Sequence, residues 1–289
     1  MRSVTRKFDS LTDMVETAAK VPADWNGDTP SAHQTDAEYV EFCGSDSFDA
    51  AANLALMGGW NDPQLSEVDS VVADCMAKVR DGGGATAWDA VYDTVGATWD
   101  LDSYLSGSPE HMVTWNPRPT KGRGQMVRVL VNLGALGNVS TGTMIRRGAA
   151  LVALCDVLAT VGKSVEVWAA TSCTSSGSQW KSTARWTSAV RLKAATDPYD
   201  RGALLFALAH PSMHRRVTFG VRANENREMR NRWGFGKWEG MGKTADLPDT
   251  LVSDLDPDVK LVKGLHNGDM ADPAGWVLDQ LEGLGLLDG

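Results

Sequence analysis

Three polar loops carry the residues of this chain that are best placed to contact a ligand. They cover residues 134–143, 171–182 and 196–200, and the first two follow apolar runs. Open parallel sheets bind ligands beyond the carboxyl ends of their strands, so we expect the loops to meet at one sheet edge. Their hydroxyl, amide and carboxylate oxygens would suit a polar ligand or a partner protein. The candidate residues are Asn138, Ser140, Thr141, Thr143, Asp197 and Asp200.

Nucleotide-binding motifs are incomplete in this chain. The loop LGALGNVSTGTM lacks both G-x-G-x-x-G and the G-x-x-x-x-G-K-[ST] of a phosphate loop. The segment 240–244, GMGKT, imitates the end of a phosphate loop, but its preceding glycine is one residue too far away. We therefore expect no nucleotide cofactor.

Metal-ligand spacing occurs twice, and each pattern fails at one point. His210 and His214 are four residues apart, as two ligands on one helix face would be, but Pro211 should end that helix. The acidic run 254–258 begins like a calcium loop but lacks the required glycine and the final glutamate. We expect surface or C-cap histidines, a solvated acidic loop over 246–258, and no bound metal.

A basic stretch with interleaved aromatic residues is the last candidate for chemistry. Such residues hold phosphates and stack on bases in proteins that bind single strands. Glu225, Glu228 and Glu239 lie among them, so the stretch could instead anchor on an acidic part of the same chain. The candidate nucleic-acid contacts are Arg215, Arg216, Arg222, Arg227, Arg230, Arg232, Trp233, Lys237 and Trp238.

The charge distribution leaves the same two alternatives open. The formal net charge of −9 divides into −11 over residues 1–125, +10 over 126–243 and −8 over 244–289. A basic middle between acidic ends indicates either that the ends pack on the middle or that the middle meets a polyanion. We prefer the first alternative, because it needs no partner.

The element that must position the loops spans residues 125–170. Residues 126–133 read as a strand, 145–161 as an apolar helix and 164–170 as a second strand. Strands joined by such a crossover normally lie parallel in one sheet. Further along the chain we predict strands over 185–194, 216–221 and 259–262, and helices over 198–210, with Asp197 as N-cap, and 273–284.

Strands and helices that alternate after residue 125 predict an α/β fold with a mostly parallel, doubly wound sheet. Before it we predict helices over 47–56 and 63–80, and a helix leading into an irregular segment over 85–112. The expected organisation is thus a helix-rich acidic lobe at 1–115, a linker near 116–124 and an α/β domain at 125–289.

The chain also indicates where the protein works. No apolar run approaches the roughly 18 residues that a membrane span needs, and the N-terminus lacks the apolar region of a secretory signal. The four cysteines are widely spaced, so cysteine-pair zinc sites are unsupported, and Cys155 should be a core residue. A reducing, cytoplasmic setting is expected, with no membrane contact.

The order of elements after residue 125, with a long apolar helix that leads to VEVWAA, resembles a von Willebrand factor A-type domain. The resemblance implies a divalent-metal site built on D-x-S-x-S after the first strand. Here that position reads Asn132–Leu136, without the aspartate, so the resemblance implies a site that has lost its metal. Three segments also resemble a family of uncharacterised, mainly bacteriophage proteins: FCGSDSFDAAANLALMGGW, LDSYLSGSPEHMV and IRRGAALVALCDVLATVGKSVEV.

These observations favour a non-enzymatic phage protein that acts as a protein-interaction or assembly module in the cytoplasm of a bacterial host. No catalytic residue can be nominated, because the sequence shows no catalytic constellation. The alternative hypothesis is a nucleic-acid-binding accessory protein in phage DNA metabolism, which would use the basic region 215–238.

Overall fold

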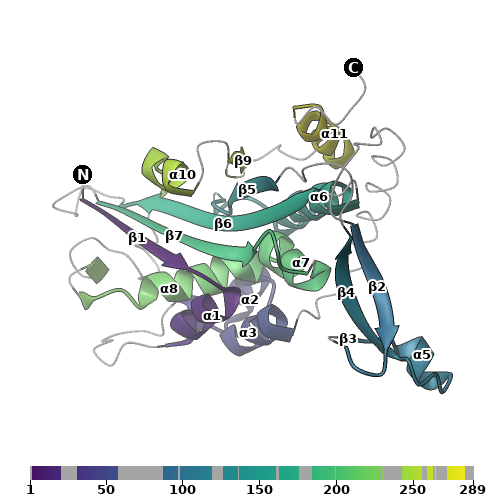
Figure 1. Cartoon of the computed structure of the whole chain (residues 1–289). Helices are drawn as coiled ribbons and strands as arrows, with labels where there is room; N and C mark the ends of the chain where they lie inside the picture. The colour runs from purple at the N-terminus through teal and green to yellow at the C-terminus, as the bar shows by residue number, and fades with distance from the viewer. Residues whose placement is uncertain are drawn as a thin grey trace.

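A six-stranded mixed β-sheet with helices on both faces forms the centre of the protein (Figure 1). The computed structural model describes residues 2–20, 31–57, 87–96, 98–118, 126–135, 137–160, 163–175, 184–198, 200–227, 229–230, 243–255, 259–262, 264 and 272–283. The helix predicted over 63–80 and most of the linker predicted over 116–124 lie outside these residues.

The strand order is β1-β7-β6-β5-β9, and β8 also pairs with β6. The strands are β1 (Arg2–Phe8), β5 (Met126–Asn132), β6 (Ser164–Thr174), β7 (Ala184–Lys193), β8 (Lys243–Thr244) and β9 (Lys260–Val262). The pairs β1/β7, β5/β6 and β5/β9 are parallel, whereas β6/β7 and β6/β8 are antiparallel. The α/β class and the predominance of parallel pairs are confirmed, but the sheet is mixed.

The predicted strand, helix and strand of residues 125–170 are confirmed as β5, α6 (Thr141–Thr160) and β6. The Ser140 hydroxyl accepts a hydrogen bond from the Thr143 backbone N–H at 3.1 Å, which is the usual way a helix begins. Cys155 of α6 is buried in the hydrophobic core of the protein, as expected. A Cβ at Gly148 would overlap the backbone of Ala209 in α7 (Arg201–Ala209), so the two helices cross closely at this glycine.

The two faces of the sheet bury different clusters, because side chains alternate along each strand. Val129 and Val131 of β5 face the larger cluster, which includes residues from α6, α7, α1 (Leu11–Ala19), α3 (Phe48–Met57) and α11 (Pro273–Gly283). Leu130 faces a smaller cluster with Trp168 and Leu251. Leu251 belongs to α10 (Asp249–Leu255). The predicted acidic loop 246–258 therefore contains a helix, because its apolar residues cover the second face of the sheet.

The N-terminal residues contribute to the same sheet and core. β1 pairs in parallel with β7 along its whole length, and the side chain of Ser10 caps α1. Met14, Val15 and Ala18 of α1 lie in the larger cluster. The division between a lobe at 1–115 and a domain at 125–289 remains a prediction, but β1 and α1 are packed with the sheet.

The strand predicted over 216–221 was wrong. These residues lie in a buried helical segment that consists of the π-helical turn η3 (Met213–Thr218) and α8 (Phe219–Ala223). Every residue from 213 to 223 is buried, so the alternation of polar and apolar types does not mark an exposed and a covered face. The segment packs between α1, α2 (Ala37–Cys43), α3 and η1 (Ser31–His33). Helix α7 also begins later than predicted, with Asp200 rather than Asp197 as its N-cap.

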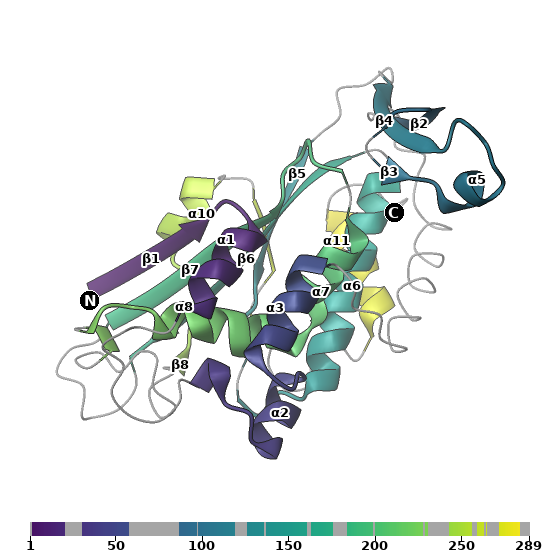
Figure 2. The same cartoon turned by 90° about the horizontal axis from the view of Figure 1, so that it is seen from below.

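Residues 87–118 form a second, small antiparallel sheet, here called the arm. Its strand order is β2-β4-β3, with β2 (Ala87–Asp93), β3 (Thr98–Trp99) and β4 (Met112–Arg118), and the short helix α5 (Leu101–Leu105) follows β3. The helix and irregular segment predicted over 85–112 were wrong. Figures 1 and 2 show the arm standing apart from the main sheet, and no arm residue belongs to a described core cluster.

Candidate functional site

A cavity of about 180 Å³ lies beyond the carboxyl ends of the parallel strands β5 and β6. Two of the three predicted segments contribute to it: Ala135 and Gly137 follow β5, while Thr171, Ser172 and Cys173, predicted as loop residues, belong to the last part of β6. Phe42 of α2, Thr244 of β8 and four residues of the buried helical segment complete the wall: His214, Arg215, Phe219 and Arg222. The predicted ligand-binding edge of the sheet thus coincides with a cavity.

The other predicted residues of the first loop do not line this cavity. The hydroxyls of Ser140 and Thr143 lie 2.9 Å apart, and Arg146 donates a hydrogen bond to the Thr143 hydroxyl. Asn138 is exposed, and Thr141 is the first residue of α6. The Ser140 and Thr143 side chains therefore hold the first turn of α6, at the solvent-facing N-terminus of that helix.

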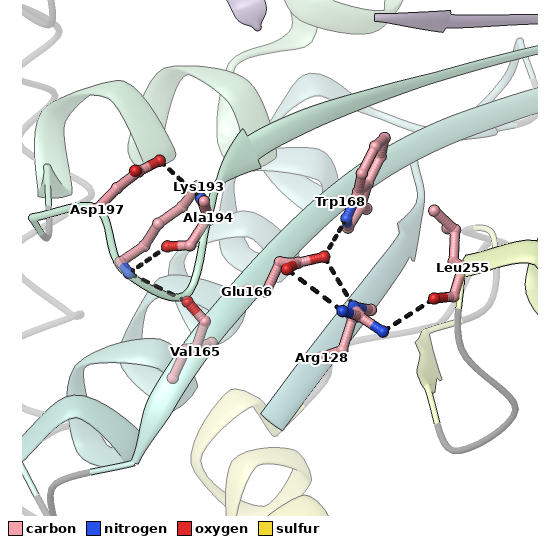
Figure 3. A network of polar contacts seen from close by, with 8 residues as sticks. All are labelled: Arg128, Val165, Glu166, Trp168, Lys193, Ala194, Asp197 and Leu255. Atoms are coloured by element: carbon pink, nitrogen blue, oxygen red, sulfur yellow. Dashed lines mark hydrogen bonds and ion pairs between the residues drawn. The ribbon is translucent and has the colours of Figure 1, made fainter. Parts of the chain in front are cut away.

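Asp197 and Asp200 lie at the opposite end of the sheet. Because β7 runs antiparallel to β6, its last residue, Lys193, pairs with Val167 near the start of β6. The Asp197 carboxylate accepts the backbone N–H of Ala194 at 2.8 Å (Figure 3), and Asp200 caps α7. The three predicted loops therefore do not converge, and these two carboxylates stabilise a turn and a helix.

Figure 3 also shows two buried or half-buried polar contacts near this end of the sheet. The Lys193 ammonium donates hydrogen bonds to the carbonyls of Val165 and Ala194, and burial lowers its pKa. Burial alone would raise the pKa of Glu166, but hydrogen bonds from Arg128 and Trp168 outweigh it and lower that pKa. Both groups are held by neighbouring elements and serve the fold.

The central part of the basic region is buried inside the protein. Arg215, Arg216, Arg222 and Arg230 are all buried. Arg216 is fully buried and donates to the carbonyls of Ala32, Gln34 and Ser45 and to the Ser45 hydroxyl, at 2.7–2.9 Å. Its guanidinium ties the segments on either side of α2 to η3. A phosphate group outside the protein cannot reach it.

Arg215, Arg222 and Arg230 are also bound within the fold. Arg215 donates to the carbonyls of Phe42 and Val139, both at 2.6 Å, and its guanidinium lies 3.9 Å from the centre of the Phe42 ring. Arg222 lies over the rings of Trp186 and Phe219. The Arg230 side chain donates to the carbonyl of Glu225.

The Glu225 carboxylate, which lay within the basic stretch, accepts hydrogen bonds from the side chains of Arg6 and Trp186. Arg216 and Arg215 do pack against residues 32–45, but they bind neutral backbone carbonyls and not carboxylates, so the expected pairing of the basic middle with acidic ends stays a prediction. Of the predicted nucleic-acid contacts, Arg227 is exposed. Arg232, Trp233, Lys237 and Trp238 lie outside the described residues.

The two histidines of the failed metal motif are buried. His210 is the C-cap of α7, as expected for a helix that ends at Pro211, and its Nδ1 accepts the backbone N–H of Ser212. His214 is only 6% exposed, and its Nδ1 has no hydrogen-bond partner among the described residues. Burial and the nearby charges of Arg215, Arg222 and Arg147 lower the His214 pKa to about 3, so its imidazole is neutral at physiological pH.

The arm carries a concentrated exposed apolar surface. Trp99 is 63% exposed, Leu105 72% and Val95 79%, although such side chains are usually covered. Further exposed apolar residues of the arm are Val91, Tyr92, Leu101, Tyr104 and Trp115. The rings of Trp99, Tyr104 and His111 contact one another, with centroids 5.2–6.2 Å apart. Individual exposed apolar residues are ordinary, but eight of them within one small sheet and its short helix are unusual.

The arm is also acidic. Residues 87–118 include five acidic residues and one basic residue: Asp89, Asp93, Asp100, Asp102 and Glu110 against Arg118. The sequence shows the mixture of aromatic and acidic residues here, but the mixture alone indicated no function. The signal that identifies the surface is the exposure of the aromatic residues, and this depends on strand pairing that the sequence does not reveal.

The family model described as "Domain of unknown function (DUF7192)" matches residues 2–288. No curated protein and no solved structure matches the chain. Among the described residues, no helix is both long and apolar enough to cross a membrane, and no group of three potential ligands is arranged to hold a metal ion.

Proposed function

The chain belongs to the DUF7192 family, and we propose that it is a non-enzymatic protein that binds another protein through the arm. The observation that carries the proposal is the exposed apolar surface of residues 91–115, with Trp99, Leu105 and Val95 at its most exposed points. Aromatic residues are enriched at protein interfaces, where they contribute a large share of the binding energy.

The composition of the arm defines the chemistry of its partner. The sequence of the arm combines acidic residues with aromatic and aliphatic ones, so a complementary surface combines apolar residues with lysine or arginine. The same negative charge would repel a phosphate backbone. We therefore assign the arm to a basic, apolar protein surface and not to a nucleic acid.

The proposal includes a bacteriophage origin, a role in interaction or assembly, and the cytoplasm of an infected or lysogenic bacterial host as its setting. The support is the resemblance of three segments to phage proteins. The likeness to a von Willebrand A-type domain without a metal is also part of the proposal. It is supported by the parallel β5/β6 and β5/β9 pairs and by Asn132, whose amide oxygen accepts the Gly134 backbone N–H at 2.9 Å.

A nucleic-acid-binding role remains the alternative hypothesis, but fewer residues could now contact a phosphate than the sequence suggested. Arg215, Arg216, Arg222 and Arg230 are buried, so any phosphate contact would depend on Arg227 and on residues 232–238. Such binding would weaken steeply as the salt concentration rises.

The proposal is tested by affinity capture from lysates of the bacterial host, with and without nuclease. Three versions of the chain are compared: wild type, Val95→Ser combined with Leu105→Ser, and Met57→Ser. Met57 is 80% exposed on α3, outside the arm, so its variant controls for the loss of an exposed apolar side chain. We expect a partner that resists nuclease, is retained by Met57→Ser and is lost from the arm variant.

Other outcomes point elsewhere. Nuclease-sensitive capture would favour the nucleic-acid alternative. Arm-dependent self-association, measured by light scattering on the purified protein, would assign the arm to a second copy of this chain. Either result, or equal capture by all three versions, would overturn the proposal.

A further inference from the structure

The cavity beyond β5 and β6 has one polar and one apolar part. Arg215, Arg222, His214 and the hydroxyl-bearing residues Thr171, Ser172 and Thr244 form the polar part. Phe42, Ala135, Cys173 and Phe219 form the apolar part. Its volume of about 180 Å³ is below the roughly 300–1,000 Å³ of sites for drug-sized ligands. The walls therefore suit a small molecule that has a polar end and a short apolar body.

The cavity is positively charged. No acidic residue is among its described lining residues, whereas two guanidinium groups are. Arg215 uses two of its five N–H groups on backbone carbonyls, and its remaining N–H groups have no acceptor among the described residues. A buried cation is costly when only neutral groups surround it, so an anion in the cavity would stabilise this arrangement.

His214 adds an independent observation. It lines the cavity, is more than nine-tenths buried, and has a ring nitrogen, Nδ1, with no partner in the described part of the chain. Buried polar atoms without a partner are uncommon in folded proteins. A second cavity beside His214 measures only about 10 Å³, which leaves room for at most one water molecule. The His214 ring thus borders both cavities, while its Nδ1 atom is itself buried.

We infer that this cavity binds a small organic anion, a carboxylate or a phosphate ester, whose charged end lies among Arg215, Arg222 and His214 and whose body contacts Phe42 and Phe219. The site is separate from the arm, so it adds a ligand to the proposed protein interaction and does not depend on it. Arginine suits both anions, because its planar N–H groups match the oxygens of carboxylates and of phosphates.

Purified full-length protein tests this with three probes: benzoate, phenyl phosphate and inorganic phosphate, each compared with chloride at equal ionic strength. Binding is measured as a saturable rise of the unfolding temperature and as a change in the ¹⁵N shifts of the His214 ring, assigned with His214→Phe. We expect at least one organic probe to produce both changes. Preference for benzoate or for phenyl phosphate identifies a carboxylate or a phosphate ester as the ligand class.

Two variants locate the binding. Ala135→Leu fills the cavity without removing a polar group, and we expect it to weaken binding at least tenfold. Gly142→Ala is the control, since a Cβ at Gly142 meets only the Ser140 hydroxyl, at an ordinary contact distance of 3.9 Å, and Gly142 is not a lining residue. The inference is overturned if no organic probe produces a saturable shift beyond chloride, or if Ala135→Leu binds as tightly as wild type while folded by circular dichroism. Binding of inorganic phosphate alone would also contradict it, because the apolar wall would then have no role.

Discussion

At the scale of single residues, the protein uses its basic side chains to hold its interior together. Arg216 and Arg215 donate to backbone carbonyls of residues 32–45, at positions where the chain forms short helices and turns. Buried carbonyls need donors, and a fork of N–H groups serves several at once. The sequence displayed these arginines as a basic cluster, and only their burial shows that they are structural.

Arg216→Met should destabilise the protein strongly. The substitution keeps an apolar stem but leaves the carbonyls of Ala32, Gln34 and Ser45 without their donors. We expect the free energy of unfolding to fall by about 3 kcal/mol or more, at roughly 1–3 kcal/mol for each unsatisfied buried group. Urea unfolding provides the measurement. Arg227→Met, at an exposed arginine, is the control and should change stability by less than about 0.5 kcal/mol. Equal effects would contradict the structural role of Arg216.

The lowered pKa of His214 predicts how the free energy of unfolding depends on pH. Its pKa is lowered to about 3 in the folded protein, by burial first and then by Arg215, Arg222 and Arg147. The unfolded chain, with a histidine pKa near 6.5, therefore binds more protons between these values. The stability that the neutral His214 ring contributes is fully present above about pH 6.5 and is lost as the pH falls toward 3. Between pH 7 and pH 5 this group alone should remove about 2 kcal/mol from the free energy of unfolding.

The pH prediction is checked by urea unfolding of wild type, His214→Phe and His111→Phe at both pH values. Phenylalanine keeps the aromatic packing against Phe219 and cannot be protonated. His214→Phe should lose less stability on acidification than wild type, by about the amount given above. His111→Phe, at a half-buried histidine of the arm, is the matched control for the change from histidine to phenylalanine. Identical pH dependence in all three proteins would show that His214 is not the group responsible.

At the scale of elements, local patterns predicted those parts of the fold that are apolar runs bounded by loop residues. β5, α6 and β6 were recognisable because apolar runs of strand and helix length are separated by glycine and polar loop residues. Val217, Phe219 and Val221 alternate with Arg216, Thr218 and Gly220, which is typical of a strand. Helices on several sides bury all six, and this tertiary packing overrides the local preference.

Similar limits applied to loops and caps. Asp197 and Asp200 both precede α7, and both carboxylates accept a backbone N–H, so the choice of N-cap depends on where the turn after β7 ends. The antiparallel direction of β7 also separates these residues from the cavity. A short apolar run in the sequence does not reveal the direction in which its strand will pair. Sequence therefore located the sheet edge that carries the cavity, through loops 134–143 and 171–182, but not the helical residues that close it.

Gly148 marks the closest approach between α6 and α7. A Cβ there would overlap the Ala209 backbone, so Gly148→Ala must push the helices apart even though alanine favours helix by about 1 kcal/mol. We expect a net loss of about 2 kcal/mol in the free energy of unfolding, because overpacking of a core typically costs 1–3 kcal/mol. Gly142→Ala, in the first turn of the same helix, places its Cβ 3.9 Å from the Ser140 hydroxyl without overlap and should be neutral or slightly stabilising. A stabilising effect of Gly148→Ala would show that the helices do not pack in this way.

At the scale of the whole molecule, the core around the sheet and the arm differ in what they expose. Four buried arginines and the N-terminal helices belong to the packed core around the sheet, while the arm, which stands apart from that sheet in Figure 2, exposes aromatic residues such as Trp99. The arm contributes to no described core cluster, so its exposed side chains are free to differ without loss of the main fold. This arrangement is what a protein that works by contact with a partner requires.

The most direct test of that role is the dissociation constant for the purified partner obtained by capture. It is measured by calorimetry with wild type, Trp99→Ser, Val95→Ser combined with Leu105→Ser, and the Met57→Ser control. Interface aromatic residues that anchor binding contribute about 2 kcal/mol or more, so we predict that Trp99→Ser weakens binding at least roughly 30-fold. The second arm variant should also weaken it, and Met57→Ser should match wild type. Unchanged affinity in both arm variants would contradict the account.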